Sequence, residues 1–441
     1  MQLLRAFRRR DFAVLVLART ISRLGDGVQA VALAWLVLQL TGSAAAMGLV
    51  LIAQLVPTLV LVAFGGAIAD RWPKVPLLVS SDAIRAVVVG IVAVLVATDS
   101  VTLPQLLVLG AVFGLVDAVF MPTWAALLPE LVPAEDRPSA NALASLTSRL
   151  AGVAGPAVGA ALVAAGGMGV AFAVDGLSFA LSGALLGWLW LARRRSGPVV
   201  SGAAAAAPEA GRRSGPVASG TEATAPEPAT PDAGRASPRR SGLTADVQAG
   251  LAAVIATPWI GLTIAAAAIT NIILTAPLDV AVPLLVARSM GGGVGVLGMY
   301  GSSVAVGAVL AAVVLGSRAR LRRRWRLVYG WWIAVALAAA AMGLPIGVGG
   351  LLVAGLVVGV GEVAVGLAWT NALQDHVPDE LLGRVSSLDY LGSAAFIPVG
   401  YLVAGVASDA VGPSAVFLVG GLVAAAILAA ITALPQIRAL D

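Results

Sequence analysis

The sequence predicts an all-α membrane protein with twelve transmembrane helices in two pseudo-symmetric six-helix bundles. Of the 441 residues, 59% are hydrophobic and only 12% are charged, and the mean hydropathy is +0.96. Such a composition is typical of an integral membrane protein. Apolar stretches long enough to cross about 30 Å of hydrocarbon recur along nearly the whole chain. Residues 351–380 also repeat residues 106–135, which indicates an internal duplication.

Each copy of the repeat carries an acidic residue in mid-span. Asp117 of the first copy is matched by Glu362 of the second. At the same offset, Leu106, Gly110, Gly114, Trp124 and Pro133 recur as Leu351, Gly355, Gly359, Trp369 and Pro378. A carboxylate near the centre of a bilayer costs about 3 kcal/mol or more, so its presence in both halves indicates a use.

Twelve apolar segments are long enough to span the bilayer, six on each side of a polar central stretch. They are predicted at 12–40, 45–68, 75–97, 104–128, 138–165 and 168–191, then at 257–287, 292–316, 325–343, 348–372, 384–407 and 412–434. The first bundle would cover residues 1–192 and the second residues 257–441. Residues 193–256 would form a cytoplasmic, largely disordered linker, because 196–242 are rich in Ala, Gly, Pro and Ser without apolar periodicity.

Basic residues gather in alternate loops. One set of loops holds Arg5, Arg71, Lys74, Arg193 to Arg195 and the run from Arg318 to Arg326, whereas the opposite set holds Arg288, Asp99 and Asp409. The positive-inside rule then places both termini and the linker in the cytoplasm of a multi-pass protein of the plasma (inner) membrane. This topology accounts for the pI of about 10.3, so we expect the lipid bilayer and no nucleic acid as a partner. We also expect a monomer.

The first predicted span holds three charged residues on one helical face. Arg19, Arg23 and Asp26 are spaced by four and three positions. In one interpretation Arg23 and Asp26 form an internal bridge that only orders the helix. In the other, Asp26 faces a central cavity and binds a proton or a cationic drug.

The loop after the second span carries a family resemblance. Its sequence GGAIADRWPK (65–74) resembles the Gly-x-x-x-Asp-Arg-x-Gly-Arg-Arg signature of the major facilitator superfamily at Gly66, Asp70, Arg71 and Lys74. A tight turn needs small residues, and an acid there can sit at the N-terminus of a neighbouring helix. The resemblance implies a gating loop that links the two halves.

Two further charges follow this loop at a helical spacing. Asp82 and Arg85 lie three residues apart near the cytoplasmic end of the third span. We expect them either to pair with each other or to act as gate partners of Asp70.

The fifth span resembles the Gly-x-x-x-Gly-Pro-x-x-Gly motif of the superfamily's antiporters. In GVAGPAVGA (152–160), the residues Gly152, Gly155, Pro156 and Gly159 would allow close helix approach and a bend. Plain helix packing is the alternative interpretation, because small-residue faces serve it in any membrane protein.

Three longer stretches look like one branch of this superfamily. They are PELVPAEDRPSANAL (129–143), SRLGDGVQAVALAWLV in the first span and TADVQAGLAAVIATPW before the seventh. They resemble the drug:proton antiporter branch that contains macrolide-efflux, multidrug-efflux and enterobactin-export proteins. The resemblance implies the major facilitator fold and transport by alternating access.

Intramembrane acids are the candidates for proton coupling or substrate binding. Asp117 and Glu362 would face each other across the cavity or lie at matched depths, where a low dielectric raises the proton affinity of a carboxylate. Alternatively, a buried Arg such as Arg149 neutralises each acid and holds helices together. Asp279 is a weaker candidate, and Asn271 fits either a cavity wall or an interhelical hydrogen bond.

Several functions are excluded by residues that the chain lacks. With no cysteine and one histidine, His376, it has no thiol chemistry and no multi-His metal site. No GxxxxGK[ST] sequence is present to bind ATP, and no Ser–His–acid triad can be assembled. We therefore expect no enzyme, no metal and no cofactor.

The sequence favours a proton-coupled exporter of amphipathic or cationic small molecules, of the multidrug efflux type, with protons and substrate as partners. Within transport, the alternatives are a dedicated exporter of a siderophore or other secondary metabolite and a lysolipid translocator. A membrane receptor or scaffold that has lost transport is the alternative from another class.

Overall fold

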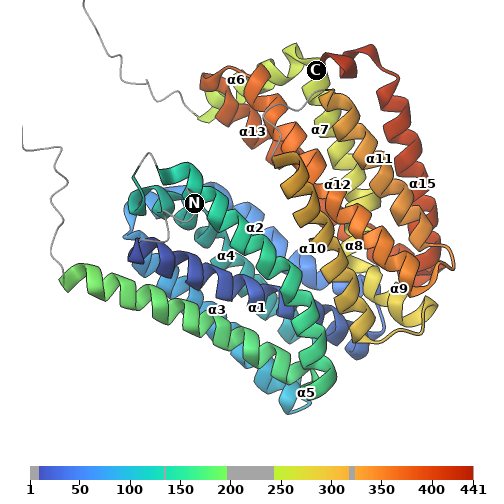
Figure 1. Ribbon diagram of the computed structural model, residues 1–441. Coiled ribbons are helices and arrows are strands. Elements are labelled where there is room, and N and C mark those ends of the chain that lie inside the picture. The colour runs from blue at the N-terminus through green and yellow to red at the C-terminus, as the bar shows by residue number, and fades with distance from the viewer. Residues whose placement is uncertain (1–8, 134–135, 196–242, 317–322, 441) are drawn as a thin grey trace, which may run out of the picture.

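The computed structural model describes residues 9–133, 136–195, 243–316 and 323–440, and all regular elements in these ranges are helices (Figure 1). Within them, the side chains of residues 62–71, 129, 138, 195, 243–249, 379–380 and 439–440 are not described. The absence of strands in this part of the chain agrees with the predicted all-α class.

The first half of the chain forms five continuous elements. They are α1 (Arg10–Thr41), α2 (Ala44–Arg71), α3 (Lys74–Ala97), α4 (Leu103–Leu131) and α5 (Arg137–Arg195). Inside α5 the chain reverses at Gly167, where φ is 80° and ψ is 173°, so α5 contains both the fifth and the sixth predicted spans (Figure 1). Glycine adopts this backbone conformation without the steric penalty that a Cβ would impose.

The second half contains shorter elements. They are α6 (Leu243–Ala256), α7 (Pro258–Thr270), the π-helical segment η3 (Asn271–Thr275), α8 (Ala276–Val280), α9 (Val282–Ser289), α10 (Val294–Gly316), α11 (Arg324–Met342), α12 (Gly347–His376), α13 (Asp379–Ala394), α14 (Ile397–Val411), α15 (Pro413–Thr432) and the 3₁₀ helix η4 (Pro435–Leu440). The seventh and eleventh predicted spans are each divided. Pro277, Pro283 and Pro398 follow these breaks, as expected for a residue that cannot donate a backbone hydrogen bond.

The count of membrane-crossing helices confirms the predicted fold class. Eleven helices in the described ranges are long and apolar enough to cross a membrane. One of them covers residues 139–194 and reverses at Gly167, so it accounts for two of the twelve predicted spans. One difference concerns the predicted linker, because its last part forms helix α6, which packs against α13.

The sequence repeat is also a repeat of packing. In the first half α4 packs along α2, and in the second half α12 packs along α10. A Cβ on Gly114 of α4 would lie 1.9 Å from the carbonyl oxygen of Gln54, and one on Gly359 of α12 would lie 1.7 Å from that of Val304. The matched glycines therefore make the same close backbone contact in both halves.

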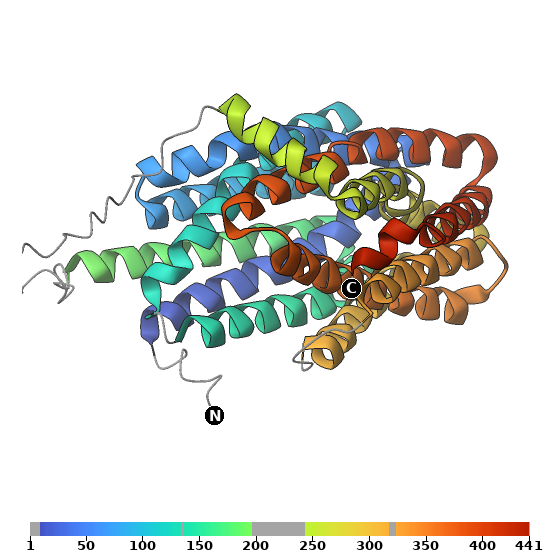
Figure 2. The same cartoon turned by 90° about the horizontal axis from the view of Figure 1, so that it is seen from above.

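The two halves touch mainly through α2 with α14 and α5 with α10. At the end where α2 begins and α14 ends, here called the closed end, a Cβ on Gly405 would lie 2.6 Å from Cα of Ala45. At the opposite end, here called the linker end, α5 ends and α6 begins (Figure 2). There the two groups of helices diverge (Figure 1). There, α13 packs on α6, α7 and α12 of its own half.

Candidate functional site

A cavity of about 400 Å³ lies between the two halves and is lined by residues of both. Its polar lining residues are Arg23, Asp26 and Gln29 of α1, Gln54 of α2, Asp117 of α4, Asp279 of α8 and Tyr401 of α14. The fold thus gathers three of the predicted acids from three helices at one place. The concentration of carboxylates inside membrane-spanning helices is costly and marks this cavity as the candidate site.

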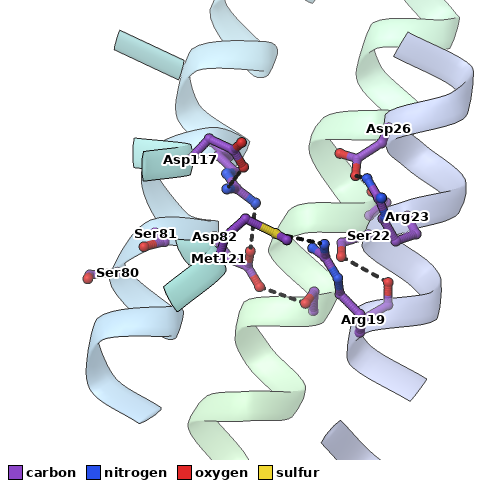
Figure 3. Close-up of polar contacts among 12 residues, drawn as sticks. Arg19, Ser22, Arg23, Asp26, Ser80, Ser81, Asp82, Asp117 and Met121 are labelled. Atoms are coloured by element: carbon purple, nitrogen blue, oxygen red, sulfur yellow. Dashed lines mark hydrogen bonds and ion pairs between the residues drawn. The ribbon is translucent and has the colours of Figure 1, made fainter. Parts of the chain in front are cut away.

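Asp26 both lines this cavity and forms an ion pair. Arg23 Nη1 lies 3.2 Å from Asp26 Oδ2, and Arg23 Nε lies 3.4 Å from Ser148 Oγ on α5. Figure 3 shows Arg19, Arg23 and Asp26 following one another along the same helix. Asp26 therefore has both the local pair with Arg23 and a position at the cavity wall.

Asp117 is paired with an arginine, but the partner differs from the expected one. Arg85 Nη2 on α3 donates to Asp117 Oδ1 at 2.5 Å. Arg149, the example of a neutralising arginine in the alternative interpretation, instead lines a different cavity beside Arg19. Arg85 is the partner because it reaches Asp117 from the neighbouring helix α3, whereas Arg149 is on α5.

Arg85 and Asp82 are buried inside the first half. Arg85 is 1% exposed and Asp82 is fully buried, with Arg85 Nη1 at 4.0 Å from Asp82 Oδ1. Asp82 Oδ2 also accepts a hydrogen bond of 2.6 Å from Ser182 of α5. The expected local pair is present, and Arg85 also links it to Asp117, whose side chain is 40% exposed.

Aromatic rings surround the buried guanidinium. The central carbon of Arg85 lies 4.3 Å from the ring centroid of Phe120, 5.4 Å from that of Phe113 and 5.6 Å from that of Phe179. These contacts are attractive because the ring faces carry negative partial charge. Arg85 is therefore held between two carboxylates and three rings, and it fixes Asp117 at the cavity wall.

The candidate acids of the second half, Asp279 and Glu362, have no arginine partner in the described part of the chain. Asp279 accepts a hydrogen bond of 3.0 Å from the hydroxyl of Tyr401. Glu362 of α12 makes no hydrogen bond or ion pair within the described ranges, and it lies within electrostatic range of Asp279 and Tyr300. The repeated acids Asp117 and Glu362 thus have different surroundings.

Asn271 forms an interhelical hydrogen bond. Its Nδ2 donates to the carbonyl oxygen of Ser393 on α13 at 2.8 Å, and its Oδ1 accepts from Thr275 Oγ1 at 3.1 Å. Of the two roles considered for Asn271, the geometry has the helix-linking one.

Part of the expected gating loop lies outside the described side chains. This holds for Gly66, Asp70 and Arg71, although helix α2 itself runs to Arg71. Lys74 begins α3 and forms an ion pair with Glu130 of α4.

The glycine-proline motif of α5 packs against two helices. A Cβ on Gly155 would lie 2.8 Å from Cα of Gly27, and one on Gly159 would lie 2.8 Å from Cα of Val28. Pro156 contacts α10 of the other half, where a Cβ on Gly301 would lie 2.9 Å from its Cβ. A Cβ on Gly152 would meet no atom within 4 Å. The motif therefore packs helices both within its half and between the halves.

A contact at the closed end was missed by the sequence reasoning. Asp409 of α14 accepts hydrogen bonds from the backbone N–H of Ala44 at 2.8 Å, that of Ala45 at 3.1 Å and the hydroxyl of Ser43 at 2.5 Å. Arg288 Nη2 also donates to the carbonyl oxygen of Gly42 at 3.0 Å. The available signal was Gly-Ser before an apolar run, which is typical of a helix start.

Comparisons with known proteins agree with this architecture. Among solved structures, the chain is similar to a bacterial homologue of the iron transporter ferroportin in an inward-facing state, with 17% identity, a TM-score of 0.66, and coverage of 96% of this chain and 98% of that one. It is also similar to a bacterial homologue of the human lysosomal transporter Spinster, with 15% identity, a TM-score of 0.64, and coverage of 99% and 97%. It is similar as well to the nucleoside transporter NupG, with 13% identity and a TM-score of 0.63. That match covers 96% of this chain and 98% of NupG.

At these identities the structural likeness establishes the fold alone. The comparison with curated proteins gave no significant match. The family model described as Major Facilitator Superfamily matches residues 15–396, which is most of the chain. The protein belongs to the major facilitator superfamily and has the fold of its transporters.

Proposed function

We propose that this protein is a proton-coupled exporter of amphipathic or cationic small molecules that works by alternating access in the plasma membrane. The observation that carries the proposal is a contrast among the three acids that line the cavity and Glu362, which is not a lining residue but lies within electrostatic range of Asp279. Asp26 and Asp117 are each held by an arginine, whereas Asp279 and Glu362 have no cation within ion-pair distance in the described part of the chain.

Acids without a cation partner suit proton-coupled antiport. In apolar surroundings a bare carboxylate is unfavourable, and either a proton or a cationic ligand relieves that cost. When both compete for Asp279 and Glu362, binding of a proton releases the substrate and binding of the substrate releases the proton. This competition is the chemical requirement for exchange.

The arrangement of the halves fits the loading step of export. The closed end is packed through small residues such as Gly405 and Gly298, whereas the helices diverge at the linker end (Figure 1). The positive-inside rule assigns the linker end to the cytoplasm. A substrate would therefore enter from the cytoplasm and leave after the closed end separates.

Transport in proteoliposomes tests the proposal. We expect the purified protein to move a cationic dye, ethidium, against its gradient when an opposing proton gradient is imposed. Asp279→Asn and Glu362→Gln should each reduce this coupled movement about tenfold or more, because one removes an ionisable group that lines the cavity and the other removes the acid within electrostatic range of it. Asp99→Asn is the matched control, since Asp99 is exposed in a loop at φ 51° and asparagine tolerates that conformation.

Two results would contradict the proposal. One is dye movement that is unchanged when the proton gradient is collapsed. The other is full coupling in both acid variants. Comparing compounds retained by cells with and without the protein then distinguishes multidrug efflux from a dedicated exporter, because only the former predicts retention of many unrelated cationic dyes.

A further inference from the structure

A second cavity of about 480 Å³ lies beside the central one and is lined by three arginines. Arg19 and Arg23 come from α1 and Arg149 from α5, and Trp124 of α4 forms part of the wall. Arg23 also lines the central cavity, so the two spaces are neighbours. No carboxylate is among the lining residues of the second cavity. A cationic compartment therefore adjoins an acidic one.

The guanidinium of Arg19 contacts soft, uncharged groups. Its Nη2 donates to the sulfur of Met121 at 3.6 Å, and its central carbon lies 4.7 Å from the ring centroid of Phe120 and 5.5 Å from that of Trp124. The acids within electrostatic range are already paired, Asp26 with Arg23 and both Asp82 and Asp117 with Arg85. Arg19 thus keeps donors that no acid among the described residues uses.

Arg149 is in the same situation. It makes no ion pair or hydrogen bond in the described ranges, and its side chain is partly exposed to the second cavity. Two arginines without a carboxylate partner in a membrane-spanning bundle raise the free energy of the folded protein unless an anion binds to them. Guanidinium groups bind carboxylates and phosphates through paired, charge-assisted hydrogen bonds.

We propose that the second cavity is a subsite for the anionic group of the transported molecule. The substrates would then be zwitterionic amphiphiles: a cationic group lies among the acids of the central cavity, an anionic group lies between Arg19 and Arg149, and an apolar part contacts Trp124. This inference rests on the proposed function and narrows its substrate class from amphipathic or cationic molecules to amphiphiles that also carry an anionic group. Arg23 lies between the two subsites.

Binding of two related dyes tests the subsite. Rhodamine B carries a cationic xanthene and a free carboxylate, and its ethyl ester lacks only the anion. In lipid nanodiscs, Arg149→Gln should raise the ratio of the rhodamine B Kd to the ester Kd about tenfold, as expected for loss of a charge-assisted hydrogen bond. Arg149→Lys should retain part of the selectivity, and Arg438→Gln, in the exposed C-terminal segment, is the control.

Further results distinguish a substrate subsite from a lipid-binding site and from the absence of any anion site. An unchanged ratio in both Arg149→Gln and Arg19→Gln, each shown to be folded by its elution profile, overturns the subsite. Competition of phosphatidylglycerol in the nanodisc with rhodamine B would assign the arginines to a lipid headgroup and overturn the substrate assignment. Failure of transport with the selectivity intact would contradict the proposed function but leave the subsite standing, because the readout is equilibrium binding.

Discussion

Asp409 caps helix α2 from the other half of the molecule by accepting the backbone N–H of Ala44 at 2.8 Å. The first N–H groups of a helix lack partners within the helix, and a carboxylate there also interacts with the helix dipole. Ser43 and Ala45 bond to the same carboxylate, so the cap joins the two halves at the closed end. Opening this end must break all of these bonds.

Removing the cap should favour opening of the closed end. Loss of a helix N-cap typically costs about 1 kcal/mol, so Asp409→Ala should shift the population toward the state open at this end about fivefold. Distances between spin labels on the first turn of α2 and the last turn of α14, measured by double electron–electron resonance, would report the shift. Asp99→Asn should leave the distribution unchanged, and an unchanged distribution in Asp409→Ala would refute the role of the cap.

Arg85 should be a determinant of stability in the first half. Arg85→Met leaves Asp82 and Asp117 without their cation, and breaking a buried ion pair on one side costs about 3–5 kcal/mol. We expect a clear fall in the unfolding temperature of the detergent-solubilised protein, measured by differential scanning fluorimetry. The triple variant with Asp82→Asn and Asp117→Asn should recover much of this loss, because no unpaired charge then remains. A triple variant as unstable as Arg85→Met alone would show that packing, and not charge, sets the cost.

The matched glycines of the repeat should have equal importance in both halves. Gly114→Ala and Gly359→Ala would each place a methyl group within 2 Å of a backbone carbonyl oxygen. Overpacking of this kind costs about 1–3 kcal/mol, and here the neighbouring backbone cannot move aside as a side chain would. Gly366→Ala is the control on α12, since its Cβ would meet no atom within 4 Å. Unfolding temperatures should fall for the first two variants and stay level or rise for the control.

The sequence predicted the elements far better than the contacts between them. Apolar runs and the repeat around Asp117 and Glu362 are local signals, and they identified twelve spans and even the reversal near Gly167. The partner of Asp117 depends on how α3, α4 and α5 rotate against one another, which periodicity does not encode. The cap on Ala44 is still harder to predict from the sequence, because it joins residues 365 positions apart.

The repeated acids should respond differently to neutralisation. Asp117→Asn removes the carboxylate that Arg85 holds at 2.5 Å, so a buried guanidinium loses its closest partner and stability should fall by about 1–3 kcal/mol. Glu362→Gln breaks no hydrogen bond or ion pair that the structure describes, and the residue is exposed, so stability should stay level. Coupled transport should show the opposite order among folded protein, with Glu362→Gln more impaired than Asp117→Asn, because Arg85 already neutralises Asp117. Measuring unfolding temperature and proton-driven ethidium efflux on the same preparations separates the two roles. Equal losses of stability in both variants would show that the halves use these acids alike, although Asp117 is paired with an arginine and Glu362 has no such pair among the described residues.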